Sequence, residues 1–552
     1  MRPLTMRSKH IRKTDISTVI LHWVLVITLF FSFLTGFRIA TDSPEENWAQ
    51  AISGILLQGD VIQWHSWSAM ALGIVIIAYI TFLLRARLHK RIAFDAEQRR
   101  QLKAGDQDKR LKALNVLIYW ISFFLLGAAV ITGLILYFLP SLLPYWIVSN
   151  THQVLAWLIV AYVALHVIAQ FAQGGVAQLL KILNPTRAYG AAALTAIVVA
   201  GLGAASLYAL DRSAVDELPV LQTDAAPTID GKADDEAWND APAVTIATSR
   251  GVNTPEGEDV TVRMVHDDDT LYTLFEWSDT TRSRKHLPLE KTAEGWRVMQ
   301  SQYGINDEND FYEDKFGVMF ATNSAIAGAG TSHLGSQPID GKPAPANGRG
   351  LHYTTDESLV DVWHWKSVRT GAMGQIDDNY FGPPMEPNPE KDRYTGGYTQ
   401  DPKTGGGYSE NWEKFDTDII TPKRLPKDPR MIEELQHVSL DPENGDSESD
   451  IFWMAMEDTV PYSEAADDYP VGTIMPSVLH EGAQQGDRGD VHAKAQWKDG
   501  RWTLEAERKL DTGSKFDFAL NDDTPLYMWV AVFDHTQTRH SQHLHPVQLV
   551  LR

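Results

Sequence analysis

Cysteine is absent from all 552 residues of the chain. Disulfide bonds, iron–sulfur clusters with thiolate ligands and thioether-attached haem are therefore excluded. An electron-carrying cofactor in this protein would have to be held without a covalent link, by side chains such as His, Met or Lys.

Positive charge is scarce in the C-terminal part of the chain. Residues 1–210 contain 18 Lys and Arg against 9 Asp and Glu, a balance of +9. Residues 211–552 contain 31 against 62, a balance of −31, and the two sum to the net charge of −22. Such asymmetry indicates that one chain spans two environments. Nucleic-acid binding needs basic surface, so it is excluded as a function of the acidic part.

Long apolar runs are abundant in the basic part. A bilayer-spanning helix needs about 20 apolar residues. Five runs are long enough, and they cover roughly residues 18–40, 61–84, 114–139, 151–171 and 190–210. The first follows a basic segment and has no small-residue cleavage site, so we interpret it as a retained helix rather than a signal peptide.

The loops between these runs alternate in charge. Lys and Arg concentrate in the N-terminal segment, in residues 85–112 and in residues 181–187, while the other two loops have none. The positive-inside rule therefore places the N-terminus in the cytoplasm of a bacterial inner membrane. Five spans then place the acidic part, from about residue 211, in the periplasm.

The acidic part carries strand patterns. Apolar and polar residues alternate at residues 260–279, 315–323, 490–510 and 526–534, and Asp499 with Gly500 forms a hairpin-turn signal. Residues 375–450 are rich in Gly, Pro, Asp and Asn, so we predict an irregular insertion there.

These patterns predict a multidomain protein with three regions. An all-α membrane domain of four helices covers residues 1–185, and a fifth spanning helix with its linker covers residues 186–215. An all-β periplasmic domain covers residues 216–552.

Four histidines fall within or at the edge of the predicted spans, where ionisable residues are costly and usually functional. The topology places His22 and His166 toward the cytoplasm, and His65 and His152 toward the periplasm. The fourteen residues from His152 to His166 cover ~21 Å of helix and turn about 40° short of four full turns. These two side chains therefore project from nearly one face at two depths.

Two pairs of imidazoles at two depths suit two metal centres. Each pair can supply both axial positions of a haem iron, whereas structural zinc needs four ligands and catalytic zinc usually three. Cofactor sites between facing helices are common in helical bundles. The alternative, in which each histidine only hydrogen-bonds within the bundle, leaves the matched levels unexplained. Bis-imidazole ligation leaves no open iron position, so such haems would carry electrons rather than bind a substrate.

The first four spans resemble the bacterial di-haem cytochrome b family, which includes cytochrome b561 and the b subunits of nickel–iron hydrogenases and formate dehydrogenases. The similarity covers about residues 10–185, and it lies in "LHW" on the first span, a His opening the second, and H-x13-H on the fourth. It implies a four-helix bundle with two haems b that exchanges electrons with the quinone pool.

Residues 220–552 resemble the haem-binding domain of the γ subunits of ethylbenzene dehydrogenase and related enzymes of the dimethyl-sulfoxide-reductase family. The similarity lies in "APTIDGKADDEAWNDAPAVTI" (226–246), "LYTLFEWSD" and "VAVFD". The first motif also occurs in carbohydrate-binding modules of similar fold, so it indicates fold better than function. The resemblance implies an immunoglobulin-like or carbohydrate-module-like β-sandwich with one haem b held by a Met and a Lys.

The sequence departs from this second family at both ligand positions. His333, in "GTSHLGS", stands where the Met is expected, and His540 or His543 stands near the expected Lys. We therefore predict a His-based ligand set for a third haem b, built from His333 with His540 or His543. The alternative ligands are His352, His364, Met319 and Met373.

The leading hypothesis is a membrane-bound b-type cytochrome that moves electrons between quinone or quinol and a periplasmic electron-transfer protein. Such a protein would act as a quinol:acceptor oxidoreductase, and no side chain is assigned a catalytic role. A second hypothesis is an anchoring subunit of a periplasmic oxidoreductase complex, with the same haems and different partners. A third is a membrane-anchored sensor with a carbohydrate- or ligand-binding module, which the four membrane histidines argue against. A homo-oligomer is compatible with each.

Overall fold

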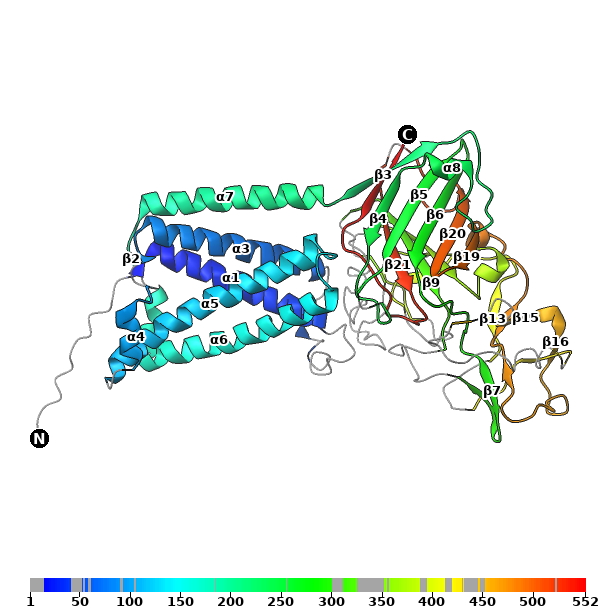
Figure 1. Cartoon of the computed structure of the whole chain (residues 1–552), viewed down its shortest axis with the longest axis horizontal. Helices are drawn as coiled ribbons and strands as arrows, with labels where there is room; N and C mark the ends of the chain where they lie inside the picture. The colour runs from blue at the N-terminus through cyan, green and yellow to red at the C-terminus, as the bar shows by residue number, and fades with distance from the viewer. Residues whose placement is uncertain are drawn as a thin grey trace, which may run out of the picture. The chain divides into compact units, whose positions relative to one another are not determined.

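The computed structural model describes residues 14–40, 52, 55–57, 61–89, 93–103, 106–183, 185–254, 256–299, 311–324, 352–354, 357–387, 395–412, 419–428, 430, 445–446, 452–521 and 524–552. They form two compact units, one of helices and one mainly of strands (Figure 1). The first unit, Met1–Phe37 with Ile62–Ala214, we call the bundle. The second unit is Arg38–Val61 with Val215–Arg552, and we call its part from residue 215 on the β domain.

Among its described residues, the bundle contains five helices that are long and apolar enough to cross a membrane, as the apolar runs predicted. The fourth begins at Tyr145, six residues before the predicted start, because Tyr145 and Trp146 extend the helix beyond its apolar run. The elements are β1 (Thr14–Asp15), α1 (Ile16–Ala40), α3 (Val61–Arg85), α4 (Ala96–Leu102), α5 (Gln107–Phe138), α6 (Tyr145–Leu180), η3 (Lys181–Leu183), β2 (Pro185–Arg187) and α7 (Gly190–Ser213).

Four of the long helices share one apolar core. Leu72 of α3, Leu126 of α5 and Ile159 of α6 are buried together, and Leu25 of α1 packs against this cluster. The fifth helix, α7, lies outside that core and contacts α3 through small side chains such as Ala192 and Ala196. The arrangement is a four-helix bundle with a fifth helix beside it (Figure 1).

The β domain is built on a strand path in the order β12-β11-β10-β9-β21-β22-β3-β5-β6-β20-β19, with β4 paired to β5. The path forms two sheets that share β3. This strand pairs in parallel with β22 through Asp216–Val220 and with β5 through Leu221 and Gln222. A β-sandwich results, as the sequence predicted.

The bounds of the elements in the β domain follow the chain. They are β3 (Asp216–Gln222), α8 (Glu236–Asn239), β4 (Ala243–Ala247), β5 (Asp259–His266), β6 (Thr270–Ser278), β7 (Leu289–Thr292), β8 (Gly295–Val298), β9 (Lys315–Ala321), β10 (Val360–Lys366), η5 (Gly371–Met373), β11 (Asp377–Phe381), β12 (Tyr398–Gln400), β13 (Tyr408–Glu410), β14 (Arg424–Pro426), β15 (Trp453–Ala455), η7 (Met456–Asp458), β16 (Thr459–Pro461), β17 (Ile474–Met475), β18 (Val478–His480), η8 (Asp487–Gly489), β19 (His492–Lys498), β20 (Arg501–Lys509), β21 (Leu526–Phe533) and β22 (Val547–Leu551).

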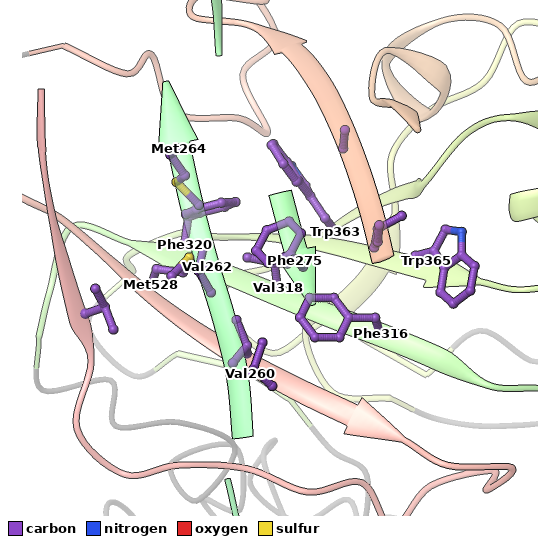
Figure 2. Close-up of a cluster of buried hydrophobic side chains, with 14 of the residues drawn as sticks. Val260, Val262, Met264, Phe275, Phe316, Val318, Phe320, Trp363, Trp365 and Met528 are labelled. Carbon is purple, nitrogen blue, oxygen red and sulfur yellow. The ribbon is translucent and has the colours of Figure 1, made fainter. Parts of the chain in front are cut away.

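Alternate side chains of the two sheets fill the interior of the sandwich. Figure 2 shows Val260, Val262 and Met264 of β5 lying among side chains of β9 and β10. Trp277 of β6 stacks on Phe316 of β9, with ring centroids 4.6 Å apart and an interplanar angle of 16°. The period-two pattern in the sequence corresponds to this buried face.

Two sequence motifs have clear structural roles. Asp499 and Gly500 join β19 to β20 with φ angles of 52° and 78°, the left-handed conformation that a two-residue hairpin turn requires. The opening motif of the domain is attached to β20 through Glu505. The Glu505 carboxylate accepts hydrogen bonds of 2.8 Å from the Gly231 backbone N–H and from Trp238 Nε1.

The predicted irregular insertion, residues 375–450, contains four short strands. β11 and β12 extend the main strand path, while β13 pairs with β18 and β14 pairs with β16. Residues 388–394, 413–418, 429, 431–444 and 447–450 of this range lie outside the described part of the chain.

Candidate functional site

His65 of α3 and His152 of α6 lie together at the end of the bundle where α1 ends and α3 begins. Their ring centroids are 6.2 Å apart and their planes are inclined at 87°. An imidazole nitrogen binds a transition metal at about 2.0 Å and lies about 1 Å from its ring centre, so two imidazoles on opposite sides of one metal have centres about 6 Å apart. The pair therefore fits axial ligation of one iron.

Hydrogen bonds fix the protonation of the His65 ring. Its Nδ1 atom lies 3.1 Å from the Ser32 carbonyl oxygen and 3.0 Å from Thr35 Oγ1. A carbonyl oxygen can only accept, so Nδ1 carries the proton. Nε2 then keeps its lone pair, which is the state that binds a metal.

His152 has the same arrangement on the other two helices of the core. Its Nδ1 lies 2.8 Å from Thr132 Oγ1. The Thr132 hydroxyl is itself 3.0 Å from the carbonyl oxygens of Ala128 and Ala129, to which it donates. Thr132 Oγ1 therefore accepts from Nδ1–H, and Nε2 of His152 also keeps its lone pair. Metal-binding histidines commonly donate their second ring N–H in this way.

Two glycines leave space beside the two imidazoles. A Cβ atom on Gly36 of α1 would lie 3.3 Å from Cε1 of His65, and one on Gly133 of α5 would lie 3.4 Å from Cε1 of His152. In both cases the second ring atom within 4 Å is Nδ1, so a larger side chain at either position would press on the Nδ1–Cε1 edge and disturb the orientation of the ring. The donor set fits a haem held between the two rings.

The structure also brings His22 of α1 near His166 of α6, close enough for the two imidazoles to interact electrostatically. His166 Nδ1 lies 3.5 Å from the Tyr162 hydroxyl, and these two rings have centroids 5.7 Å apart. The partners that topology assigned to each pair are thus neighbours in the fold. The second pair has weaker hydrogen-bond support than the first.

In the β domain, both ring nitrogens of His543 are engaged within the protein. Nε2 accepts a 2.9 Å hydrogen bond from the Val530 backbone N–H, and Nδ1 donates to the His545 carbonyl oxygen at 2.7 Å. This imidazole holds the β21 backbone in place and has no nitrogen left for a metal.

His540 and His364 both lie against Phe533, with ring centroids 4.6 and 5.2 Å from it. His540 Nδ1 donates to the Ser541 carbonyl oxygen at 2.9 Å. His364 has a buried Nε2 with no hydrogen-bond partner among the described residues. Burial and the neighbouring Lys366 and Lys315 hold the pKa of His364 well below its usual range, so its ring is neutral.

The remaining candidates of the β domain are scattered. His333 lies outside the described residues. His352 lies beside Phe381 and Tyr398, while Met319 is on β9 and Met373 is in η5. Of these histidines, His364 has a buried ring nitrogen with no hydrogen-bond partner among the described residues, and His540 lies against the same Phe533 ring.

Sequence reasoning missed the residues that support the membrane histidines. Thr35 with Gly36 and Thr132 with Gly133 form the same Thr-Gly dipeptide, in "FLTGF" (33–37) on α1 and "VITGL" (130–134) on α5. The dipeptide occurs on α1, before α3 with His65, and on α5, before α6 with His152. This repeat in the sequence could have indicated the supporting residues.

The two family matches fall on opposite sides of the boundary between the bundle and the β domain. Residues 13–184 match the family described as prokaryotic cytochrome b561, and residues 235–544 match the family described as ethylbenzene dehydrogenase. None of the curated proteins matches the chain.

Two solved structures similar to the chain are of a carbohydrate binding module of family 9 from Caldicellulosiruptor kristjanssonii. The complex with cellotriose has 11% identity and a TM-score of 0.23, and covers 61% of this chain and 94% of that one. The complex with glucose has 10% identity and a TM-score of 0.23, and covers 60% and 95%. Similarity at this level says nothing about a sugar ligand here.

Proposed function

Because this chain belongs to the ethylbenzene dehydrogenase family and carries a prokaryotic cytochrome b561 domain, we propose that it moves electrons between the quinone pool and a redox partner in the periplasm. The helical part is a membrane b-type cytochrome. The proposal adds two haems b in the bundle, one for each histidine pair, and one in the β domain. The observation that carries it is the His65–His152 pair at 6.2 Å, with both Nδ1 atoms occupied.

Bound haem b supplies reversible one-electron transfer. The residues around the first pair prepare the ligands. Thr35 and Thr132 hold each ring in one orientation and one tautomer, and the hydrogen bonds raise the basicity of Nε2. Gly36 and Gly133 keep side chains away from the faces beside the rings.

Helix α6 contributes one histidine to each pair, and these two histidines lie at two levels along the helix. This separation supports electron transfer across the bilayer. His152 and His166 are both in α6, and fourteen residues of helix span ~21 Å. The basic loops place the His22–His166 level toward the cytoplasm and the His65–His152 level toward the periplasm. Electrons would then cross most of the hydrocarbon core between the two levels.

We propose His540 as an axial ligand of the haem in the β domain, with His364 or His333 as its partner. Support comes from the family match and from the position of the His540 ring against Phe533. The buried, unpartnered Nε2 of His364 on the same aromatic ring adds a second donor.

The soluble partner is proposed to be basic. Residues 211–552 carry 62 Asp and Glu against 31 Lys and Arg, and such a field steers positively charged proteins toward the domain. With cytochrome c as a basic probe, the rate of electron exchange should fall steeply between low and physiological ionic strength. A rate independent of salt would argue against an electrostatically steered partner.

Pyridine-haemochrome quantitation on the purified full-length protein tests the proposal. Three haems b per chain are expected, and the double variant His65→Ala/His152→Ala should lose one. His540→Ala should lose a different one, while His543→Ala should keep all three. A count of two in the wild type, unchanged in His540→Ala, would limit the haems to the bundle, and the absence of haem would refute the function.

A further inference from the structure

Five aspartates from distant parts of the sequence meet beside the β10–β11 pair. Asp361 is on β10, Asp378 is on β11 and Asp401 follows β12, while Asp490 follows η8 and Asp517 lies between β20 and β21. One carboxylate oxygen from each of Asp361, Asp378 and Asp517 lies within 4.8 Å of the others. The backbone N–H of Asp401 donates to the Asp378 carbonyl oxygen at 3.1 Å, which brings the fourth carboxylate to the cluster.

A single cation faces this cluster among the described residues. Arg508 Nη1 donates to Asp361 Oδ2 at 2.7 Å, and its Nη2 donates to the Phe518 carbonyl oxygen at 3.0 Å. One guanidinium therefore leaves most of the negative charge uncompensated.

The oxygens themselves lack donors. Asp361 Oδ1, Asp378 Oδ2 and both carboxylate oxygens of Asp401 are buried without a hydrogen-bond partner among the described residues, and these three residues are at most 3% exposed. The same is true of one oxygen each on Asp490 and Asp517. Buried polar atoms are nearly always paired, and an unpaired carboxylate is especially costly. A metal cation, which several oxygen atoms can coordinate at once, would satisfy them all.

We propose that this cluster binds one Ca²⁺ ion, with Asp361, Asp378 and Asp517 as ligands and Asp401 and Asp490 as further oxygen donors. Calcium takes six to eight oxygen ligands at 2.3–2.6 Å, so two oxygens on one ion lie up to about 5 Å apart. The three carboxylate oxygens lie within 4.8 Å of one another, so one such ion can bind them together. Mg²⁺ usually keeps several waters and binds one or two carboxylates, so a cluster of five carboxylates favours Ca²⁺. Asp490 and Asp517 are partly exposed, which gives the ion a route from solvent.

A second acidic cluster in the domain differs from the first because protein hydrogen-bond donors satisfy its buried carboxylate. Asp314, Asp534 and His535 also lie within 4.8 Å of one another. However, Asp314 Oδ2 accepts hydrogen bonds from the Ser283 N–H and Trp502 Nε1, and Oδ1 accepts from the His535 N–H. Protein donors already satisfy that carboxylate, so no cation is needed there.

The test uses the full-length protein in detergent after EDTA treatment, titrated with CaCl₂ and, separately, with MgCl₂. Calorimetry should detect one tight Ca²⁺ site per chain. At a hundredfold excess over Kd, Ca²⁺ should raise the unfolding midpoint of the β domain by roughly 5 °C. Asp517→Asn should abolish both effects, and the exposed Asp468→Asn should retain them.

The melting temperatures of Asp517→Asn and the wild type in EDTA distinguish a cation site from a cluster whose carboxyl groups share protons in hydrogen bonds. In EDTA at pH 7.5, Asp517→Asn should melt no lower than the wild type, because the substitution removes repulsion. Absence of Ca²⁺ binding by the wild type, or unchanged binding by both Asp517→Asn and Asp378→Asn, would overturn the proposal. Equal stabilisation by Mg²⁺ would overturn its assignment to calcium.

Discussion

The imidazoles of His65 and His152 lie 6.2 Å apart between ring centres, with planes at 87°. Each ring comes from one helix and is held by a threonine on another, Thr35 of α1 for His65 and Thr132 of α5 for His152. All four helices of the core thus contribute to one site. Both Nδ1 atoms are used within the protein, so the Nε2 atoms are the ones available to a metal.

Replacing Thr132 with Val should weaken haem retention at the His65–His152 pair. The His152 ring would lose its side-chain acceptor, and loss of such a partner typically costs 10–100-fold in metal affinity. Haem content after dilution into haem-free detergent, together with the midpoint potential of each haem, measures the effect. Thr28→Val is the matched control, because the Thr28 hydroxyl bonds only to carbonyl oxygens of its own helix. Equal haem loss in both variants would contradict the role of Thr132.

Replacing Gly36 with Val should remove one haem from the bundle. The new Cβ would lie 3.3 Å from Cε1 and 3.6 Å from Nδ1 of His65, so the branched side chain would push the ring out of its hydrogen-bonded orientation. The haem count per chain should fall by one, with the other haems retained. Gly201→Val on α7 is the control, since a Cβ there meets nothing within 4 Å. A full haem count in Gly36→Val would show that the space is not used.

Replacing Asp377 with Asn should destabilise the β domain by about 3–5 kcal/mol, the usual cost of breaking a buried ion pair. Asp377 is fully buried and bonds to both Lys366 and Arg488. Urea unfolding of the full-length protein, followed by near-ultraviolet circular dichroism, measures the loss. The exposed pair of Asp428 with Arg430 supplies the control, since Asp428→Asn should leave the unfolding midpoint in urea essentially unchanged.

Acidification should destabilise the β domain through His480. This ring stacks on Trp453 with centroids 4.4 Å apart, and burial lowers its pKa to about 4. Between pH 4 and 6.5 the unfolded chain binds more protons than the folded one, so the free energy of unfolding falls as the pH is lowered through that window. The loss can reach ~3 kcal/mol. His480→Phe keeps a stacked ring and cannot be protonated, so its stability should vary less with pH. An unchanged pH dependence would contradict this assignment.

The membrane histidines were predictable because helix geometry and the bilayer fix depth. His152 and His166 could be paired with His65 and His22 from sequence separation and loop charge alone. Thr35 and Thr132 could not be identified in this way, because a threonine in an apolar helix usually bonds to its own backbone. The aspartate cluster was also invisible, since Asp361 and Asp517 meet only through the pairing of strands that are distant in sequence.

The position of β3 has a mechanical consequence. The bundle helix α7 ends at Ser213 and β3 begins at Asp216, so any pull between membrane and domain enters the sandwich through this strand. β3 is not an edge strand but is paired in parallel with β22 on one side and β5 on the other. A load along β3 is therefore shared as shear by the hydrogen bonds of both sheets. Peeling from the tether would open the β22 ladder at Asp216–Val220 before it reached the β5 ladder at Leu221 and Gln222.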